Sequence, residues 1–101
     1  MVYKIVFRPA ARADLKALYS YIAKQADHRV AGAYIDRIEA SCRSLAIFPE
    51  RGTVRDDLFP GVRVIGFEHR ASIAFIVEAD TVRILRVLYG GQMFPKDWSA
   101  E

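Results

Sequence analysis

Apolar and polar residues alternate at the start of the chain, where Tyr3, Ile5 and Phe7 share the more apolar side of an extended segment. A period of two is typical of a β-strand, so we predict a first strand over residues 3–7. Pro9 follows at a position where proline is tolerated, the first turn of a helix. From there apolar residues recur every three or four positions up to Gln25, and this spacing predicts an amphipathic helix.

A second helix is predicted to begin after Asp27, because aspartate is a favoured N-cap residue. Pro49 ends this helix just after Phe48, since the residue before a proline disfavours the helical conformation. Cys42 lies on the apolar stripe and no histidine pattern accompanies it, so we expect it in the core rather than as a nucleophile. The predicted stripe contains Ala31, Tyr34, Ile35, Ile38, Cys42 and Leu45.

Three strand-like segments follow a loop at residues 49–61 that has proline and glycine at both ends. We place these strands at residues 62–67, 71–78 and 82–89. The element order is then β-α-α-β-β-β. It predicts an α+β fold in which a helical hairpin packs on one face of a four-stranded, mostly antiparallel sheet, with the N-terminal strand beside the last three. The core is expected to contain Ile5, Leu15, Leu18, Ile22, Ile38, Leu45, Ile73, Phe75, Ile84 and Leu88.

The last two strands can be aligned if Ala79 and Asp80 form a two-residue hairpin loop, the simplest connection available. Facing residues then share a face of the sheet. The apolar face pairs Val77 with Val82, Phe75 with Ile84, Ile73 with Arg86 and Ala71 with Leu88, and we expect it to lie under the helices. The other face is expected to be open and to gather Arg70, Ser72, Arg83 and Tyr89.

Composition indicates one domain, because a chain of 101 residues can bury only a single core of modest size. We expect this domain to span residues 1–92, with a tail at residues 93–101. A lone cysteine cannot form an internal disulfide, which favours a reducing, cytoplasmic location. The net charge is +3, and eleven of the fifteen basic residues are arginine. That bias suits a polar interface, although a GC-rich genome would produce it too.

Few catalytic or metal-binding patterns are present. His28 and His69 are far apart in sequence and no cysteine pair exists, so neither a metal nor another cofactor is expected. Asp56 and Asp57 are adjacent in a loop, where carboxylates usually cap the backbone or pair with arginine. The remaining candidate is the predicted open face, with Arg55 at its edge. It could bind phosphate or the carboxylates of a protein partner, or it could be an ordinary solvated surface.

Four short motifs, in this order and spacing, give the chain a family likeness. They are Phe-Pro-Glu-Arg-Gly at residues 48–52, Arg-Asp-Asp-Leu at 55–58, Pro-Gly-Val-Arg at 60–63 and Ile-Leu-Arg-Val-Leu-Tyr-Gly at 84–90. Together with the element order, they resemble the RelE/ParE toxin superfamily of type II toxin–antitoxin systems from Tyr3 to about Gln92. The resemblance implies a small cytoplasmic toxin that needs no cofactor. It also implies neutralisation by an antitoxin encoded beside it, ParD-like or similar.

RelE-like members of the superfamily cut messenger RNA on the ribosome with a basic cluster. They commonly carry two basic residues two positions apart on the second strand, whereas this chain has Arg63 and then Ile65. They also commonly carry an arginine beyond the last strand, where this chain has Gln92. Arg70 matches a phosphate-binding arginine of that subfamily. As an RNA-cleaving enzyme, the chain would therefore use Arg63, Arg70, Arg83 and Tyr89.

ParE-like members instead poison DNA gyrase by protein–protein contact and perform no bond chemistry. The motifs at residues 55–58 and 60–63 and the Leu-Arg-Val-Leu run favour this subfamily. The chain departs from it at Tyr89, where histidine is common, and at Gly91 and Gln92, where basic residues are common. The resemblance thus implies no catalytic residues, gyrase as the target and an antitoxin complex that can also contain a toxin homodimer. Candidate partner contacts are Arg55, Met93, Phe94 and Trp98, although the tail could equally fold back on its own domain.

Overall fold

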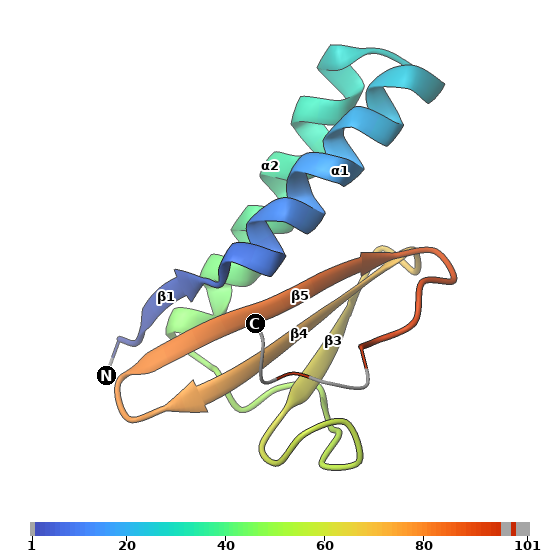
Figure 1. The fold of residues 1–101 in the computed structure, drawn as a ribbon. Coiled ribbons are helices and arrows are strands. Elements are labelled where there is room, and N and C mark those ends of the chain that lie inside the picture. The colour runs from blue at the N-terminus through green and yellow to red at the C-terminus, as the bar shows by residue number, and fades with distance from the viewer. Residues whose placement is uncertain (1, 96–97, 99–101) are drawn as a thin grey trace.

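The computed structural model describes residues 2–95 and 98. It has a helical hairpin on one side of a twisted sheet (Figure 1), which confirms the predicted α+β class. The elements are β1 (Lys4–Phe7), α1 (Pro9–Gln25), α2 (His28–Arg43), the 3-10 helix η1 (Ser44–Ala46), β2 (Thr53–Val54), β3 (Arg63–Phe67), β4 (Ala71–Glu78) and β5 (Thr81–Tyr89).

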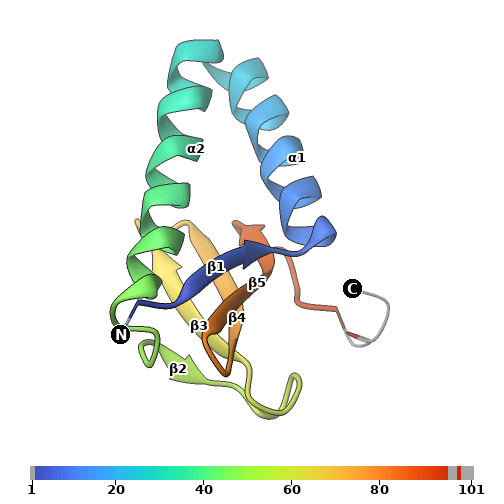
Figure 2. The ribbon, with the colours of Figure 1, turned by 90° about the vertical axis from the view of Figure 1, so that its left-hand side faces the viewer.

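The sheet has five strands in the order β1-β5-β4-β3-β2. β1 runs parallel to β5 and every other neighbouring pair is antiparallel. The prediction of four strands missed β2, which lies inside the expected loop and pairs Thr53 with Val64 (Figure 2). Gly52 makes this pairing possible. Its φ is +81°, and a Cβ at this position would lie 2.3 Å from the Val64 carbonyl oxygen.

Both helices begin where the sequence predicts. Pro9 stands in the first turn of α1, and the Asp27 carboxylate caps α2 by accepting the Val30 N–H at 2.8 Å. The predicted end of the second helix at Phe48 was wrong, because the chain tightens into η1 after Arg43. Leu45 nevertheless stays fully buried, so the apolar stripe continues through the change of helix type.

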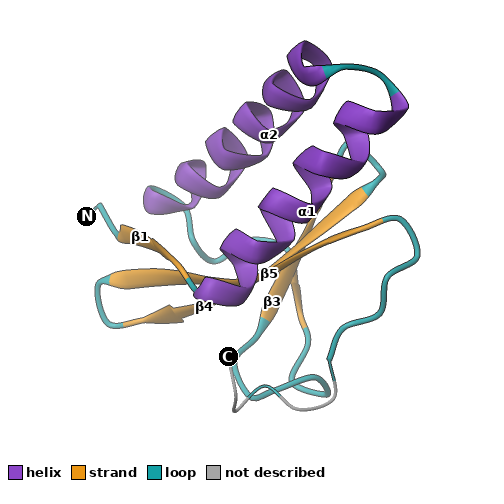
Figure 3. Ribbon diagram, turned by 45° about the horizontal axis from the view of Figure 1, so that its top comes forward, coloured by secondary structure: helices purple, strands orange, loops and turns teal. Residues whose placement is uncertain are grey.

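The main core lies between the hairpin and the sheet (Figure 3), and the predicted core residues other than Leu88 belong to it or pack against it. Leu88 is buried but is not part of this cluster, because a shift in the register of β5 changes the faces of the strand before it. Phe75, Ile38 and Ile73 are fully buried, while Ile5 is only partly buried against the same cluster. Cys42 is also fully buried, and desolvation raises the pKa of its thiol to about 12. The prediction of Cys42 as a core residue is confirmed by this burial. A raised pKa also keeps the thiol protonated, whereas the nucleophile is the thiolate.

The hairpin of β4 and β5 follows the predicted alignment only as far as the pair Phe75–Ile84. Leu85 is then an extra residue, a β-bulge, and the pairing resumes with Ala74 opposite Arg86 and Ile73 opposite Val87. The predicted pairs Ile73–Arg86 and Ala71–Leu88 were therefore wrong. An extra residue reverses the faces of the strand beyond it. Val87 and Tyr89 accordingly pack on the helical side.

The second face of the sheet is not open, contrary to the prediction. A separate apolar cluster of Val62, Ala74, Leu85 and Trp98 is buried there, with Phe94 and Leu58 packed against it. The tail therefore supplies the cover for this face. None of the helices that the structure describes is long and apolar enough to cross a membrane.

Candidate functional site at the end of strand β5

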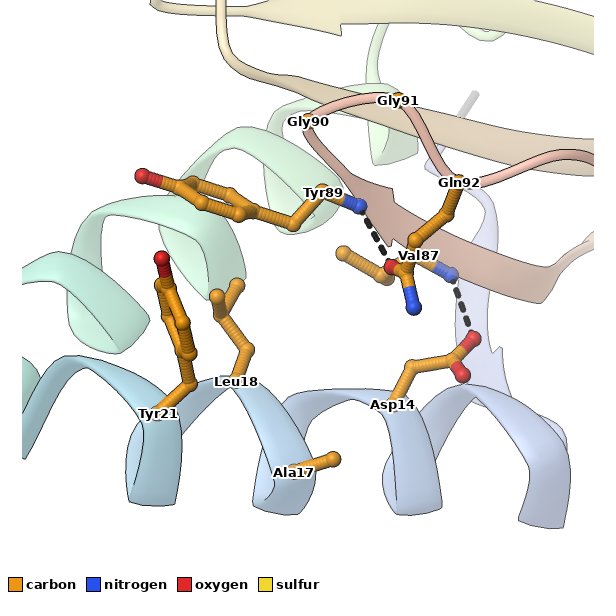
Figure 4. Close-up of a pocket in the computed structure, with 9 residues that line it drawn as sticks. All are labelled: Asp14, Ala17, Leu18, Tyr21, Val87, Tyr89, Gly90, Gly91 and Gln92. Atoms are coloured by element: carbon orange, nitrogen blue, oxygen red, sulfur yellow. Dashed lines mark hydrogen bonds between the residues drawn. The ribbon is translucent and has the colours of Figure 1, made fainter. Parts of the chain in front are cut away.

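A groove of about 410 Å³ lies between α1 and the last residues of β5 (Figure 4). One wall is helical, the opposite wall is the strand, and the turn after β5 closes one end. Tyr21 is half exposed in this groove, so an aromatic ring is available to a partner. The lining residues are Asp14, Ala17, Leu18, Tyr21, Val87, Tyr89, Gly90, Gly91 and Gln92.

The strand edge beside this groove is hydrogen-bonded to side chains instead of to another strand. β1 pairs with β5 only from Thr81 to Ile84. Further along, the Val87 N–H donates to the Asp14 carboxylate at 2.9 Å, and the Tyr89 N–H donates to Gln92 Oε1 at 2.9 Å. Both bonds are visible in Figure 4. These acceptors satisfy backbone groups that would otherwise offer an edge to another chain.

Asp14 is fixed by more than the strand. Its two carboxylate oxygens also accept hydrogen bonds from Arg86 Nε at 2.7 Å and Nη2 at 2.8 Å. The two side chains are only 13% and 22% exposed, so the pair is shielded from solvent. Asp14 therefore holds α1 against the bulged part of β5, and its charge is balanced inside the molecule.

Tyr21, Tyr34 and Arg70 lie near Tyr89 at the end of β5. The Tyr89 ring lies with its centroid 6.0 Å from Tyr21 and 6.0 Å, edge-on, from Tyr34. A hydrogen bond with the Tyr89 hydroxyl raises the pKa of the Arg70 guanidinium above its ordinary value. Burial raises the pKa of Tyr34, whose hydroxyl is enclosed and has no hydrogen-bond partner among the described residues.

The turn between β3 and β4 positions Arg70. Glu68 and His69 both have left-handed backbone conformations, with φ of 50° and 60°, and the Arg70 N–H closes the turn on the Phe67 carbonyl at 3.0 Å. Glu68 accepts two hydrogen bonds from Arg37 at 2.9 and 3.2 Å, and this pairing lowers the pKa of Glu68. The Arg70 carbonyl in turn accepts the Gly90 N–H at 2.7 Å. The turn is thereby joined both to α2 and to the end of β5.

Comparison with known proteins identifies this architecture. A family model described as the ParE toxin of type II toxin–antitoxin systems, parDE, matches residues 5–94. The chain belongs to the ParE toxin family. Over 77 residues it is 31% identical to the toxin ParE3 of Caulobacter vibrioides, with 76% of each chain covered.

Solved structures agree on the fold of this ParE-family chain. The chromosomal ParDE toxin–antitoxin system from P. aeruginosa matches with a TM-score of 0.77 at 24% identity, covering 88% of this chain and 97% of that one. The toxin–antitoxin complex RelBE2 from Mycobacterium tuberculosis matches with a TM-score of 0.60 at 22% identity, covering 91% and 95%. The RelE/ParE resemblance seen in the sequence is therefore confirmed.

The residues predicted for RNA cleavage do not gather on one face of this ParE-family toxin. Arg63 faces Phe75 across the β3–β4 ladder, so it lies on the helical side of the sheet. Arg83 lies opposite Ile76 on the other side, where its Nε donates to Glu78 at 2.6 Å. Tyr89 is on the helical side. Of the four residues, Arg70 and Tyr89 lie close enough for Tyr89 to raise the pKa of the Arg70 guanidinium.

The four residues predicted to contact a partner do not lie in the same kind of environment. Arg55 makes a two-bond ion pair with Asp57 at 2.8 and 2.9 Å, and Asp56 accepts the Gly61 N–H at 2.8 Å. These loop carboxylates have the structural roles that were expected of them. In the tail, Met93 is 87% exposed, whereas Trp98 is 6% exposed and stacks with Phe94 at a centroid distance of 6.0 Å. Trp98 and Phe94 thus pack against their own domain, which is the second of the two arrangements expected for the tail.

Sequence reasoning missed Asp14, Gln92 and Tyr34 as parts of the site. Tyr21 carried a signal, since it is an aromatic residue off the apolar stripe of α1, but Asp14 resembles any polar residue of a helix. Its partner Arg86 is 72 positions away and was predicted to face the core. Among residues 2–95 and 98, no three histidine, cysteine or acidic side chains are grouped as a metal site would require.

Proposed function

We propose that this ParE-family chain is a cytoplasmic toxin that poisons DNA gyrase by protein–protein contact and is neutralised by a ParD-like antitoxin. The observation that carries the proposal is the separation of Arg83 and Tyr89 onto opposite sides of the sheet. It removes the shared face on which an RNA-cleaving cluster would have to operate. A gyrase poison needs no such cluster, because its effect depends on surface contact.

The chemistry of RNA cleavage supports the same choice. A base or acid must lie within about 2.6–3.2 Å of the group that it serves, and the charge that develops on phosphate must be met by cations fixed nearby. Arg83 is already paired with Glu78, and it lies on the face of the sheet that carries the second apolar cluster. Loss of members from a cooperative catalytic cluster usually removes most of the activity.

One contact favours a second candidate function, a RelE-like endonuclease that cuts messenger RNA on the ribosome. Arg70 is exposed and lies near enough to Tyr89 for the tyrosine to raise the pKa of its guanidinium, so a cation and a phenol lie together where a phosphate could reach them. In that case Arg70 would bind the phosphate, and Tyr89 would act as the acid or base at the 2′-hydroxyl or at the leaving 5′-oxygen. No metal would be required for this chemistry either.

Induced expression of the isolated chain separates the two functions. If gyrase is the target, we expect double-strand breaks and filamentous cells, while messenger RNA ends stay unchanged. Breaks should diminish in cells that carry excess gyrase. Cuts in messenger RNA that follow codon phase, with intact chromosomes, would overturn the gyrase proposal.

A double substitution, Arg70→Ala with Tyr89→Phe, sharpens the result. If these residues act in general acid–base and charge-stabilising roles, RNA cutting should fall by about a hundredfold or more. A gyrase poison whose contact surface lies elsewhere should stay toxic in this variant. Thermal unfolding of the variant must first show that it is folded.

A further inference from the structure

We propose that the edge of the sheet at β1 binds the phosphate backbone of duplex DNA through Arg12 and Arg43, two arginines that lie over the ring of Phe7. This contact goes beyond the proposed function, which calls only for gyrase itself. The DNA is the segment that gyrase holds, and that choice of source rests on the proposed function. Phosphate contacts of this kind position a protein on DNA without reading its sequence.

Phe7 brings one cation from each helix to this edge. β1 lies between the start of α1 and the end of α2 (Figure 2). The guanidinium carbon of Arg12 lies 5.3 Å from the centre of the Phe7 ring, and that of Arg43 lies 5.9 Å from the same centre. Phe7 is only 8% exposed, whereas both arginines are exposed. A buried ring at the end of β1 thus fixes the positions of two charged groups at the surface.

Both guanidinium groups keep their hydrogen-bond donors available. Attraction to an aromatic face uses the charge of the cation and leaves the N–H groups of a guanidinium free to bind oxygen. Among residues 2–95 and 98, neither Arg12 nor Arg43 forms an ion pair through its side chain, and Glu39, one turn before Arg43, is half-buried and pairs with neither. The arginines that do bond to carboxylates are Arg37, Arg55, Arg83 and Arg86. The charges of Arg12 and Arg43 are therefore available to an external anion.

Helix stability does not account for Arg12. It lies in the first turn of α1, which contains no acidic residue. The partial positive charge at the N-terminus of a helix disfavours a cation there. Lys16 follows four positions later on the same side of the helix, and it is also exposed without an ion pair in the described part of the chain. A cation placed where it costs stability indicates a role in binding, so we define Arg12, Lys16 and Arg43 as the basic surface.

The basic surface points away from the groove beside β5. Successive residues of a helix are about 100° apart, so Asp14, Ala17 and Tyr21 of the groove lie about 140–180° around α1 from Arg12. A ligand bound to Arg12 therefore leaves the groove accessible. The chain can hold DNA at β1 and a protein in the groove at the same time.

Charge and shape favour duplex DNA over a second copy of this chain or an acidic protein. β1 is an edge strand, but a copy paired along it would bring Arg12 and Arg43 close to the same two residues, and like charges repel. Between the two guanidinium groups, Phe7 is too covered to serve as the apolar anchor that protein interfaces usually contain. A DNA strand carries one negative charge about every 3.4 Å along its axis, so neighbouring phosphates can meet both cations.

Removal of the two arginine charges tests the contact. The variant is Arg12→Gln with Arg43→Gln, because glutamine keeps a polar, unbranched side chain without the charge. The matched control is Lys24→Gln with Arg29→Gln, which removes the same charge from exposed positions at the far end of the hairpin. The probe is a short random-sequence DNA duplex, titrated with the full chain at several salt concentrations and followed by fluorescence anisotropy. Should the double variant not fold, each arginine is replaced singly, with half of the change expected.

Wild type and control should bind the duplex alike, with the dissociation constant of a non-specific site, about 10⁻⁴–10⁻⁶ M near physiological salt. We expect the Arg12/Arg43 variant to bind at least about tenfold more weakly at low salt. Its plot of log affinity against log salt should be shallower by about 1.8, since each phosphate contact contributes about 0.9 to the slope. Equal weakening in both double variants would overturn the proposal. So would a wild-type chain that binds poly-glutamate or single-stranded RNA but not the duplex.

A gyrase assay separates this contact from the proposed function. With purified gyrase and plasmid DNA, wild type should accumulate cleaved DNA. The Arg12/Arg43 variant should accumulate several-fold less, although it binds gyrase without DNA as tightly as wild type does. If both accumulate cleaved DNA equally, the DNA contact is wrong and the gyrase function stands. If wild type binds the duplex through these arginines but leaves gyrase unaffected, the gyrase function is wrong, and with it the source of the DNA, whereas the basic surface remains a DNA site.

Discussion

The backbone of two adjacent residues determines the geometry at the end of the site. Glu68 and His69 occupy the two central positions of the turn that the Arg70 N–H closes on the Phe67 carbonyl, and both have positive φ, as the central residues of a type I′ turn do. Glycine and asparagine usually fill such turns, because other residues pay about 1–2 kcal/mol each for the left-handed conformation. Glu68 gains two hydrogen bonds with Arg37 in return, whereas the His69 side chain makes none within the described residues.

His69→Gly should therefore stabilise the protein. We expect a gain of about 1 kcal/mol, because relief of the left-handed strain exceeds the extra unfolded-state entropy of glycine, about 0.5–1 kcal/mol. Urea unfolding at neutral pH measures the change. Glu68→Gly is the matched control. It relieves the same strain but loses the pairing with Arg37, so its gain should be smaller. A destabilised His69→Gly variant would show that the histidine makes a contact of its own.

Within β5, one extra residue divides the strand into two functional parts. Before the bulge, the strand pairs with β1 and continues the alternation expected from sequence. After it, Val87 and Tyr89 line the groove, and their N–H groups are bound by side chains. The shielded pair of Asp14 and Arg86 joins this second part to α1. Asp14 of the helix thus binds the Val87 N–H of this edge, and Gln92 of the following turn binds the Tyr89 N–H.

Replacing that carboxylate should loosen the second part of β5. We expect Asp14→Ala to lower the free energy of unfolding by about 2–3 kcal/mol, since hydrogen bonds to charged groups contribute roughly 1.5–3 kcal/mol. Asp14→Asn should lose less, because its carbonyl can still accept the Val87 N–H. Chemical denaturation measures both variants. Asp36→Ala, at an exposed position of α2, should change stability by no more than about 0.5 kcal/mol. Equal effects of the alanine and asparagine variants at position 14 would contradict the role given to Val87.

Across the whole molecule, the sheet is covered on both sides by unequal layers. The helical hairpin covers one face with a large core, and the other face depends on a small cluster that Trp98 completes. Trp98 is buried although its indole N–H has no partner among the described residues. An enclosed donor without an acceptor reduces the net gain from burying the ring. The tail therefore closes the outer face through apolar contact.

Trp98→Ala should open this face. Large-to-small changes of a buried tryptophan cost about 3–5 kcal/mol, and we expect the lower end here because the cluster is small. Circular dichroism during urea unfolding measures the loss, and binding of a hydrophobic dye should rise. Trp98→Phe should retain most of the stability, since phenylalanine has no N–H to leave unpaired. Because Trp98 is the single tryptophan, its wild-type fluorescence should shift to the red on unfolding. A solvent-like emission in the native protein would contradict the buried position.

Local patterns in the sequence determined the parts of this protein that depend on near neighbours. Helical spacing placed α1 and the start of α2, the proline and aspartate signals placed their first turns, and alternation placed the strands. The two-residue loop at Ala79 and Asp80 fixed the first half of the β4–β5 alignment correctly. The motif order identified the family, and Arg70 and Tyr89 were recognised as candidates. Each of these inferences depends on residues close together along the chain.

Only the tertiary structure decided the bulge, the covered outer face and the groove. Because of the bulge, Leu85 packs in the outer cluster with Trp98 and Val87 packs in the main core. Strict alternation would place these two residues on the same face, so the sequence pattern could not predict this arrangement. The groove depends on Asp14 meeting Arg86, which is 72 positions away, and on Gln92 folding back onto Tyr89. Such contacts are selected by packing among distant elements. The sequence therefore determined which segments form and which family they build, whereas the packing of those segments decided which side chains share a site.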